Sequence, residues 1–358
     1  MEKVRLGDVC EKGSSNIAQK DLEGNEGKYP IYGASGLIKY VDFYKQDKEY
    51  IAIVKDGAGV GRTMILPAYS SVIGTMQYIF PKNNIDISFL YYAITHMGLG
   101  KYFSGATIPH IYFKDYQKEK FNIYEIEEQK KIAYVLDKIT ELIDKRKQQL
   151  EKLDELVKSR FVEMFGDPVI NPMKWVIKSV IEECSCMVPG RDKPKSFTGD
   201  IPWITIEDLN VNGITIKSQN GLGLTIEEIN QVNRKTIPIG SVIMSCVGNL
   251  GVCSIAGQEM VINQQLHSFQ CGERINNIYL MYNLSCRKDF MNKWASNTTV
   301  LYMNKTICNS IPIMLPPIDL QQQFAAFVEQ TDKSKLSVKQ ALEKLETLKK
   351  ALMQKYFE

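Results

Sequence analysis

Apolar residues recur at alternating steps of four and three along two long stretches of the chain. In the first stretch, residues 126–165, this spacing continues for more than four heptads without Gly or Pro. Such a spacing predicts a long helix that buries one apolar stripe against a partner helix. Gly166 and Pro168 follow, and both residue types end helices. The seam consists of Ile132, Leu136, Ile139, Ile143, Leu150, Leu153, Val157 and Met164, with Arg146 and Arg160 at its two polar places.

The second stretch, residues 318–358, has the same spacing but a weaker seam. Its positions are Phe324, Val328, Thr331, Lys335, Val338, Leu342, Leu345 and Leu352. A long helix with an exposed apolar stripe is not stable alone, so each helix needs a partner. We expect the two helices, each reaching about 57 Å, to form an antiparallel coiled coil. The alternative is that each helix packs on its own globular module.

The two stretches are copies of one sequence. Residues 147–153 (KQQLEKL) return as residues 339–345 (KQALEKL), 192 positions later. This shift holds without gaps across nearly sixty residues and predicts an internal duplication. It also aligns Thr107 with Thr299, Ile126 with Ile318, Gln129 with Gln321, Ala133 with Ala325, Leu156 with Leu348 and Phe165 with Phe357.

The blocks before each helix, residues 1–125 and 167–317, are rich in short apolar runs separated by Gly and Pro. Runs of this kind predict short strands. We expect strands at residues 50–54, 71–73, 201–206, 241–244 and 260–262, and a short helix from Phe89. The expected fold is therefore α+β, with two β-rich modules related by pseudo-two-fold symmetry and separated by the two long helices.

Composition adds few constraints. A chain of 358 residues with 44% hydrophobic content is long enough for two domains. The formal charge of +3 neither demands nor excludes nucleic acid. The first residues carry mixed charge without an apolar signal core, and no apolar run reaches the roughly 20 residues needed to span a bilayer. We therefore expect a cytoplasmic protein without a membrane role.

Motifs for catalysis are missing from the sequence. It has no G-x-x-x-x-G-K-[ST] phosphate loop, and Gly57-Ala58-Gly59-Val60-Gly61 is better explained as a tight turn before a strand. Its three histidines are far apart along the chain. Seven of eight cysteines lie in the second half, and Cys184-Ser185-Cys186 is too closely spaced for a usual zinc pair. We expect free thiols, no metal, no catalytic residue and a binding function.

Several residues are candidates for contact with DNA. Basic side chains neutralise phosphates, and Asn, Gln and Arg can bond base edges. The alternative for each is an ordinary exposed or half-buried surface residue. The candidates in the first module are Tyr32, Lys55, Arg62, Thr75, Gln77, Lys101, His110 and Lys114. Those in the second are Arg191, Lys193, Lys195, Asn249, Asn263, Gln264, Gln265 and Lys305.

The whole chain resembles the specificity (S) subunit of type I restriction–modification systems. The residues that carry the resemblance are Tyr29–Leu37 (YPIYGASGL), Gly199–Thr205 (GDIPWIT), Phe165–Pro168 (FGDP) with Asn171-Pro172 and Trp175, and Leu315–Gln321 (LPPIDLQ). The first copy has Tyr124-Glu125 in place of the Pro pair, which leaves the start of its helix less sharply defined. No one motif is decisive, but their order around two long helices is specific.

The resemblance implies a division of labour. Residues 1–125 and 167–317 would be target recognition domains, each reading one half of an asymmetric bipartite DNA site. The helices 126–166 and 318–358 would set the spacer length and dock two modification subunits. Those subunits would carry the adenine-N6 methyltransferase chemistry and S-adenosylmethionine. Motor–nuclease restriction subunits would add ATP- and Mg-dependent cleavage.

Two other hypotheses stay open at the level of sequence. One is a coiled-coil scaffold with two protein-binding modules and no DNA role. The other is a methyltransferase or nuclease that acts alone, which the missing motifs argue against; Asn171-Pro172-Met173, for example, differs from an Asn-Pro-Pro-Tyr motif.

Overall fold

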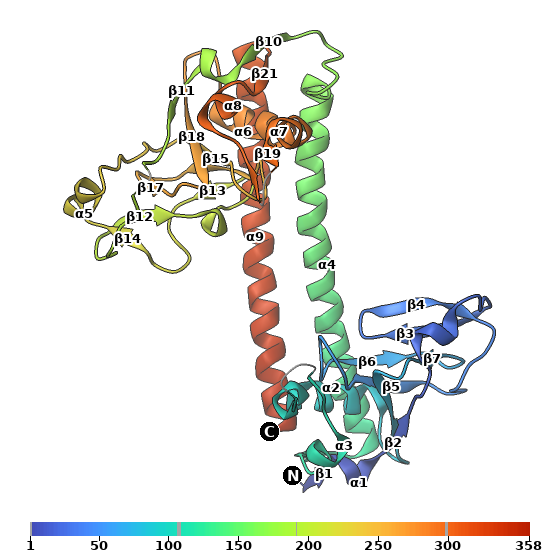
Figure 1. Cartoon of the computed structure of the whole chain (residues 1–358). Helices are drawn as coiled ribbons and strands as arrows, with labels where there is room; N and C mark the ends of the chain where they lie inside the picture. The colour runs from blue at the N-terminus through green and yellow to red at the C-terminus, as the bar shows by residue number, and fades with distance from the viewer. Residues whose placement is uncertain (1, 106–108, 191, 298–299) are drawn as a thin grey trace. The chain divides into compact units, whose positions relative to one another are not determined.

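The computed structural model describes residues 2–105, 109–190, 192–297 and 300–358, which form two compact units. The first unit comprises Met1–Gln148 and Val338–Glu358, and the second comprises Gln149–Ser337. The long helices α4 (Ile126–Phe165) and α9 (Ile318–Phe357) each have 40 residues (Figure 1). Each unit therefore consists of one β-rich module, the start of one long helix and the end of the other.

The first module is built on a four-stranded antiparallel sheet with the order β2-β8-β5-β6. Its strands are β2 (Cys10–Ser14), β8 (Met76–Pro81), β5 (Tyr50–Val54) and β6 (Thr63–Leu66). A second sheet, β4-β3-β7, and the pair β1-β9 complete it. These strands are β1 (Glu2–Arg5), β3 (Tyr29–Gly33), β4 (Gly36–Val41), β7 (Ser71–Val72) and β9 (Lys120–Ile123). The helices are α1 (Leu6–Val9), α2 (Ile87–Met97) and α3 (Phe113–Tyr116), with 3₁₀ turns at Gln19–Leu22 and Leu99–Tyr102.

The second module repeats this plan with one more strand in its main sheet. The order is β11-β18-β15-β16-β13, and a three-stranded sheet β14-β12-β17 and the pairs β10-β21 and β19-β20 accompany it. The strands are β10 (Val176–Ser179), β11 (Cys184–Met187), β12 (Ile201–Ile204), β13 (Ile214–Thr215), β14 (Gly223–Leu224), β15 (Val242–Ser245), β16 (Cys253–Ala256), β17 (Val261–Ile262), β18 (Leu266–Cys271), β19 (Ser296–Asn297), β20 (Leu301–Tyr302) and β21 (Pro312–Leu315). The helices are α5 (Ile226–Gln231), α6 (Asn277–Ser285), α7 (Lys288–Trp294) and α8 (Lys305–Asn309), with 3₁₀ turns at Val180–Glu182 and Ile206–Asp208.

A buried glutamine joins the start of each long helix to its module in the same way. In the first unit, Gln129 accepts a hydrogen bond from the backbone N–H of Asp86, the N-cap of α2, at 2.9 Å. In the second unit, Gln321 accepts from the N–H of Asn276, the N-cap of α6, also at 2.9 Å. Each side-chain amide also donates to two backbone carbonyls. This match supports the duplication that the sequence predicts.

Within both units the long helices run in opposite directions, as expected for an antiparallel coiled coil. In the first unit, Tyr124, just before α4, donates its hydroxyl to the carbonyl of Tyr356 near the end of α9 at 3.1 Å. In the second unit, Phe161 near the end of α4 lies 5.4 Å from Phe324 near the start of α9, measured between ring centroids. The long helices also pack on the β-rich modules. The alternative expectation, that each helix packs on a module, therefore accounts for the rest of the buried helix surface.

The basic side chain of Lys335 is largely buried in the helix–helix seam of the second unit. Lys335 is 13% exposed and lies 2.8 Å from Asp154 of the opposite helix and 3.2 Å from Asp332. Burial lowers the pKa of Lys335, but its contacts with the two carboxylates outweigh this effect and raise it. The weak place in the seam is therefore filled by an ion pair, and Thr331 beside it is buried.

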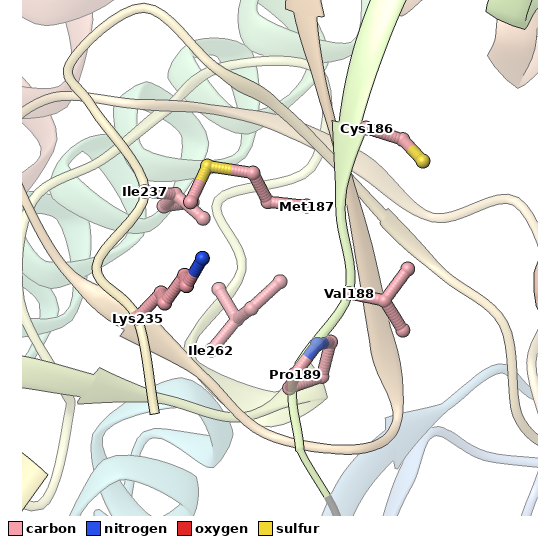
Figure 2. Close-up of a pocket in the computed structure, with 7 residues that line it drawn as sticks. All are labelled: Cys186, Met187, Val188, Pro189, Lys235, Ile237 and Ile262. Atoms are coloured by element: carbon pink, nitrogen blue, oxygen red, sulfur yellow. The ribbon is translucent and has the colours of Figure 1, made fainter. Parts of the chain in front are cut away.

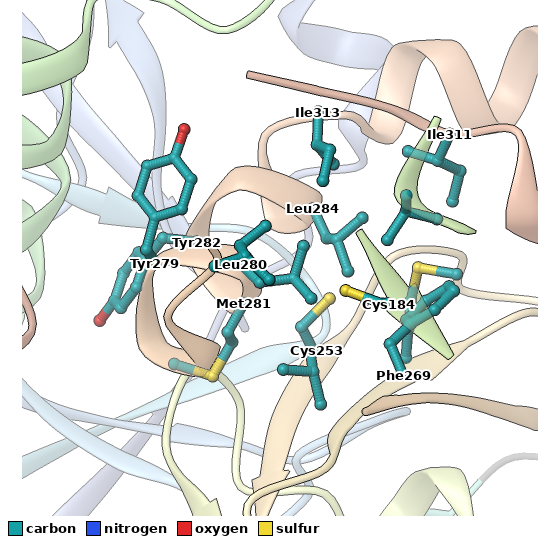
Figure 3. Close-up of a cluster of buried hydrophobic side chains, with 14 of the residues drawn as sticks. Cys184, Cys253, Phe269, Tyr279, Leu280, Met281, Tyr282, Leu284, Ile311 and Ile313 are labelled. Atoms are coloured by element: carbon teal, nitrogen blue, oxygen red, sulfur yellow. The ribbon is translucent and has the colours of Figure 1, made fainter. Parts of the chain in front are cut away.

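The main core of the second unit lies between its larger sheet and the helices packed on it (Figure 3). Cys184, Cys253 and Phe269 from the strands meet Leu280 and Leu284 from α6 there. The cysteines carry free thiols, as expected from their spacing. Among the described residues, no helix is long and apolar enough to cross a membrane.

Candidate nucleic-acid interface

A glycine-rich turn between β5 and β6 forms the centre of the candidate site in the first module. The N–H of Gly61 donates to the carbonyl of Val54 at 2.8 Å, and the N–H of Val54 donates to the carbonyl of Arg62 at 2.9 Å. Gly61 has a φ of +85°, and a Cβ there would lie 2.4 Å from the backbone nitrogen of Gly100. Only glycine allows this approach. The expected tight turn before a strand is thus confirmed.

Two neighbouring loops dock on this turn through backbone hydrogen bonds. The N–H of Gly57 donates to the carbonyl of Pro109 at 2.9 Å, and the N–H of Ile111 donates to the carbonyl of Lys55 at 2.9 Å. The N–H of Lys55 donates to the carbonyl of Thr75 at 3.0 Å. We call this set the first loop cluster; it comprises residues 55–62, 74–75, 104–105 and 109–111.

The second module builds its turn with the same three bonds. The N–H of Gly248 donates to the carbonyl of Leu301 at 2.8 Å, and the N–H of Met303 donates to the carbonyl of Cys246 at 2.9 Å. The N–H of Cys246 donates to the carbonyl of Gln265 at 2.8 Å. This second loop cluster comprises residues 246–251, 263–265, 296–297 and 301–303. The two clusters therefore share one backbone frame.

Charged side chains line the first loop cluster. Asp56 lies between the side chains of Lys55, at 3.9 Å, and His110, whose Nδ1 contacts its carboxylate. All three are about a quarter exposed. Burial and the charge of Lys55 lower the pKa of His110. Arg62 donates to the carbonyl of Ala34 at 3.0 Å, which connects the turn to the β3–β4 loop, just after Tyr32.

Neutral side chains occupy most of the second loop cluster. Asn263 donates its side-chain amide to Oε1 of Gln265 at 2.9 Å. Val247 and Tyr302 stand where the first cluster has Asp56 and His110, because each pair forms the same antiparallel bridge. The exposed Asn249 accepts from the ammonium of Lys288 at 2.8 Å. The same frame thus presents different chemistry in the two modules.

The remaining candidates lie at several places. In the first module, Lys101 pairs with Glu119 at 2.5 Å on the 3₁₀ turn that packs against Gly61, and the exposed Lys114 lies over the ring of Tyr112 at 5.2 Å. In the second module, Gln264 and Lys305 are exposed. Lys193 and Lys195 line a cavity of about 500 Å³ beside α5. Arg191, Thr107 and Thr299 lie outside the described residues.

Gln77 is a wrong candidate. It is 2% exposed and donates its side-chain amide to the hydroxyl of Tyr116, so it is part of the core. Thr75 lies in the turn before β8, whereas Gln77 lies inside this strand, where all four residues from Met76 to Ile79 are buried.

Among the described residues, no group of three or more His, Cys, Asp and Glu side chains is placed to hold a metal ion. A cavity of about 260 Å³ in the second module is lined by apolar side chains and the amine of Lys235 (Figure 2). Burial lowers the pKa of His267 to about 4, so this histidine is neutral at pH 7 and bonds Asn309.

Sequence reasoning missed Asp56 and the pairing of residues 109–111 and 301–303 with the glycine turns. The bridges Ser104–His110 and Ser296–Tyr302 differ by the same 192 positions as the helices. The repeat alignment reaches these segments, because it pairs Thr107 with Thr299, but it does not show that they pair with the glycine turns. It would not have found Asp56, because the second copy has Val247 at this position.

Comparison with known proteins agrees with the two-copy architecture. The family model described as "Type I restriction modification DNA specificity domain" matches residues 1–155 and 177–347, so each match covers one module and much of the helix after it. This is the class of DNA specificity proteins with two recognition modules. The chain belongs to the family of type I restriction–modification specificity subunits.

Individual relatives are distant. The MjaVIII specificity subunit of Methanocaldococcus jannaschii is 22% identical over 98% of this chain and 91% of its own length. The HindI specificity subunit of Haemophilus influenzae is 24% identical over 45% of this chain, a match that spans only 37% of the HindI protein. The crystal structure of an S subunit from M. genitalium has the same fold, with a TM-score of 0.65 at 15% identity, covering 100% of this chain and 96% of that one.

Proposed function

We propose that this chain selects the DNA sequence on which a type I restriction–modification complex acts. Each loop cluster contacts one half of a bipartite asymmetric site on double-stranded DNA. The two long helices set the length of the spacer and dock two modification subunits, and restriction subunits join them. S-adenosylmethionine, ATP and Mg²⁺ act on those partner subunits.

One observation carries the proposal: a single backbone frame occurs twice with different side chains. The frame rests on three matched hydrogen bonds in each module. Side chains on this frame are charged in the first module and mostly neutral in the second. Direct readout of bases depends on such donor and acceptor patterns, so two unlike patterns suit two unlike half-sites.

The helices and the segment after α4 support the docking of protein partners. Outside their seam, the helices expose mixed charges, which suits a polar partner surface. Several apolar side chains of the segment from Val169 to Ile181 are also exposed, Ile170 and Val176 most of all, at 74% and 62%. In the first module, Glu2 of β1 stands where Val176 stands in β10. Exposed apolar surface of this kind marks protein interfaces.

A salt series on the complex with its modification subunits tests the role in DNA binding. We expect the affinity for random duplex DNA to fall steeply between low and moderate salt, because each phosphate contact releases counterions. Lys101→Ala and Lys114→Ala should each reduce the slope of log K against log salt by about 1. Lys48→Ala is the matched control, at an exposed position before β5 and at the opposite end of that strand from the glycine turn. Affinity that does not change with salt would favour a protein-binding scaffold instead.

A further inference from the structure

The contact between His110 and Asp56 fixes which ring nitrogen carries the proton. Nδ1 of His110 faces an oxygen of Asp56 within hydrogen-bond distance. A carboxylate can only accept, so Nδ1 must be the donor. In a neutral imidazole the other nitrogen, Nε2, then carries a lone pair and acts as an acceptor.

The surroundings of His110 favour the neutral ring. Burial and the nearby ammonium of Lys55 lower its pKa below the ordinary value of 6.5. Asp56 contacts its ring, Lys55 pairs with Asp56 at 3.9 Å, and the ring of Tyr112 lies 4.1 Å from that of His110 between centroids. Burial and Lys55 therefore favour the uncharged ring, and the contact with Asp56 favours its proton on Nδ1.

The acceptor atom is open to a ligand. The side chain of His110 is 26% exposed, and Nε2 has no hydrogen-bond partner among the described residues. Exposed aromatic side chains stand on both sides of it along the chain: Phe103 is 59% exposed and Tyr112 is 48% exposed. The imidazole is therefore partly exposed on the first loop cluster, in an environment suited to contact with a base edge.

Only two bases present a donor to such an acceptor in the major groove. Adenine offers its N6 amine and cytosine its N4 amine, whereas guanine and thymine present acceptor oxygens there. A neutral Nε2 therefore bonds adenine or cytosine and faces a lone pair on guanine O6 or thymine O4. Because Asp56 fixes the proton on Nδ1, the neutral His110 prefers the two bases that present an amine, adenine and cytosine.

We propose that Nε2 of His110 accepts a hydrogen bond from the exocyclic amine of an adenine or cytosine in the first half-site, and that Asp56 is the positioning residue for this contact. The inference rests on the proposed function, because it requires that the first loop cluster meets DNA. It concerns one base position only. In the second module, Val247 and Tyr302 occupy the equivalent places and cannot form such a pair.

The experiment is to sequence methylated sites produced by the whole complex, with the second half-site as internal control. His110→Ala should reduce discrimination at one adenine or cytosine of the first half-site by about fivefold, which corresponds to the net worth of one hydrogen bond, about 1 kcal/mol. His110→Gln offers Oε1 as an acceptor and should keep the preference. Tyr302→Ala, at the equivalent position of the second module, should leave the first half-site unchanged.

The substitution Asp56→Asn tests whether Asp56 sets the tautomer of His110 or only stabilises the fold. The side-chain amide that this substitution introduces can donate to Nδ1, which allows the proton to move to Nε2 and makes that atom a donor. The variant should therefore accept guanine or thymine at the same position, a change that a purely structural role would not produce.

Three results would overturn the inference. A relaxed position that is guanine or thymine in the wild-type site would contradict it, as would loss of preference in His110→Gln equal to that in His110→Ala. An unchanged motif in His110→Ala would also contradict it while leaving the proposed function standing. If the wild-type complex gives no bipartite motif at all, the proposed function itself is wrong and the inference falls with it.

Discussion

Glu228 illustrates how one carboxylate joins three segments of the second module. It is 7% exposed and accepts hydrogen bonds from the hydroxyl of Ser196, from the N–H and hydroxyl of Thr198, and from the N–H of Thr225 at 2.9 Å. Thr225 is also the N-cap of α5 and accepts in return from the N–H of Glu228. These bonds, with that from Ser196 the largest effect, lower the pKa of Glu228 to about 2.

The first prediction follows from this shift. Because the folded-state pKa lies below the ordinary value of 4.5, the stabilisation by Glu228 is complete above about pH 4.5 and is lost as the pH falls toward 2. We expect Glu228→Gln to lower the free energy of unfolding at about pH 6 and to flatten its decline below about pH 4.5. Urea unfolding across this range measures both effects. Glu207→Gln changes an exposed carboxylate and should behave as wild type; an equal effect of both variants would contradict the argument.

At single positions, sequence reasoning predicts residue types better than their directions. It names Lys55, Arg62 and Thr75 as candidates, and the structure brings them together in the first loop cluster. It also names Gln77, yet this side chain is buried. The first four residues of β8 are all buried, and composition alone does not show that this strand is covered on both faces. Asp56 escapes notice because its partner His110 is 54 positions away.

At the scale of elements, the end of each long helix carries an aromatic anchor. Phe165 is fully buried, 4.8 Å from Tyr279 and 5.6 Å from Phe324 between ring centroids. Its repeat equivalent, Phe357, lies 5.1 Å from Phe89. Each anchor packs on the short helix of a module, α6 or α2. The heptad spacing predicts both helices, but it cannot show that each ends against a module.

Removing an anchor should loosen one unit at a time. Phe165→Ala leaves a cavity among rings and should lower the stability of the second unit by about 3–5 kcal/mol. Phe357→Ala should do the same for the first unit. Hydrogen exchange of α6 and α2, followed by mass spectrometry, distinguishes the two.

Val162→Ala, at a position on α4 that is 50% exposed, is the control and should change neither unit. If Phe165→Ala increased exchange equally in both short helices, the anchors would not act separately.

At the scale of the whole chain, the duplication can be followed more easily in the two long helices than in the two modules. The helices share short stretches such as 147–153 and 339–345, as well as Gln129 and Gln321 with their matched bonds, whereas the modules share a backbone frame and differ in the side chains on it. The proposed function accounts for this difference, because docking of one kind of partner needs one surface and reading of two half-sites needs two. The helices reveal the repeat in the sequence because coiled-coil packing restricts many consecutive positions. The shared backbone frame of the modules cannot be detected from the sequence, because almost any residue can form its backbone hydrogen bonds.

The last prediction concerns the spacer. Each long helix begins in one unit and ends in the other, and in the proposed function its length sets the spacer of the DNA site. Four residues inserted in both copies, after Gln148 and after its equivalent Gln340, add about 6 Å of helix. We expect the spacer of the methylated site to grow by one or two base pairs, since each step is about 3.4 Å, while both half-sites keep their sequence. Insertion into α4 alone would interrupt the pairing with α9 and should reduce methylation without giving a new discrete spacer. A spacer unchanged by the double insertion, or a changed base in either half-site, would show that the helices do not set the distance.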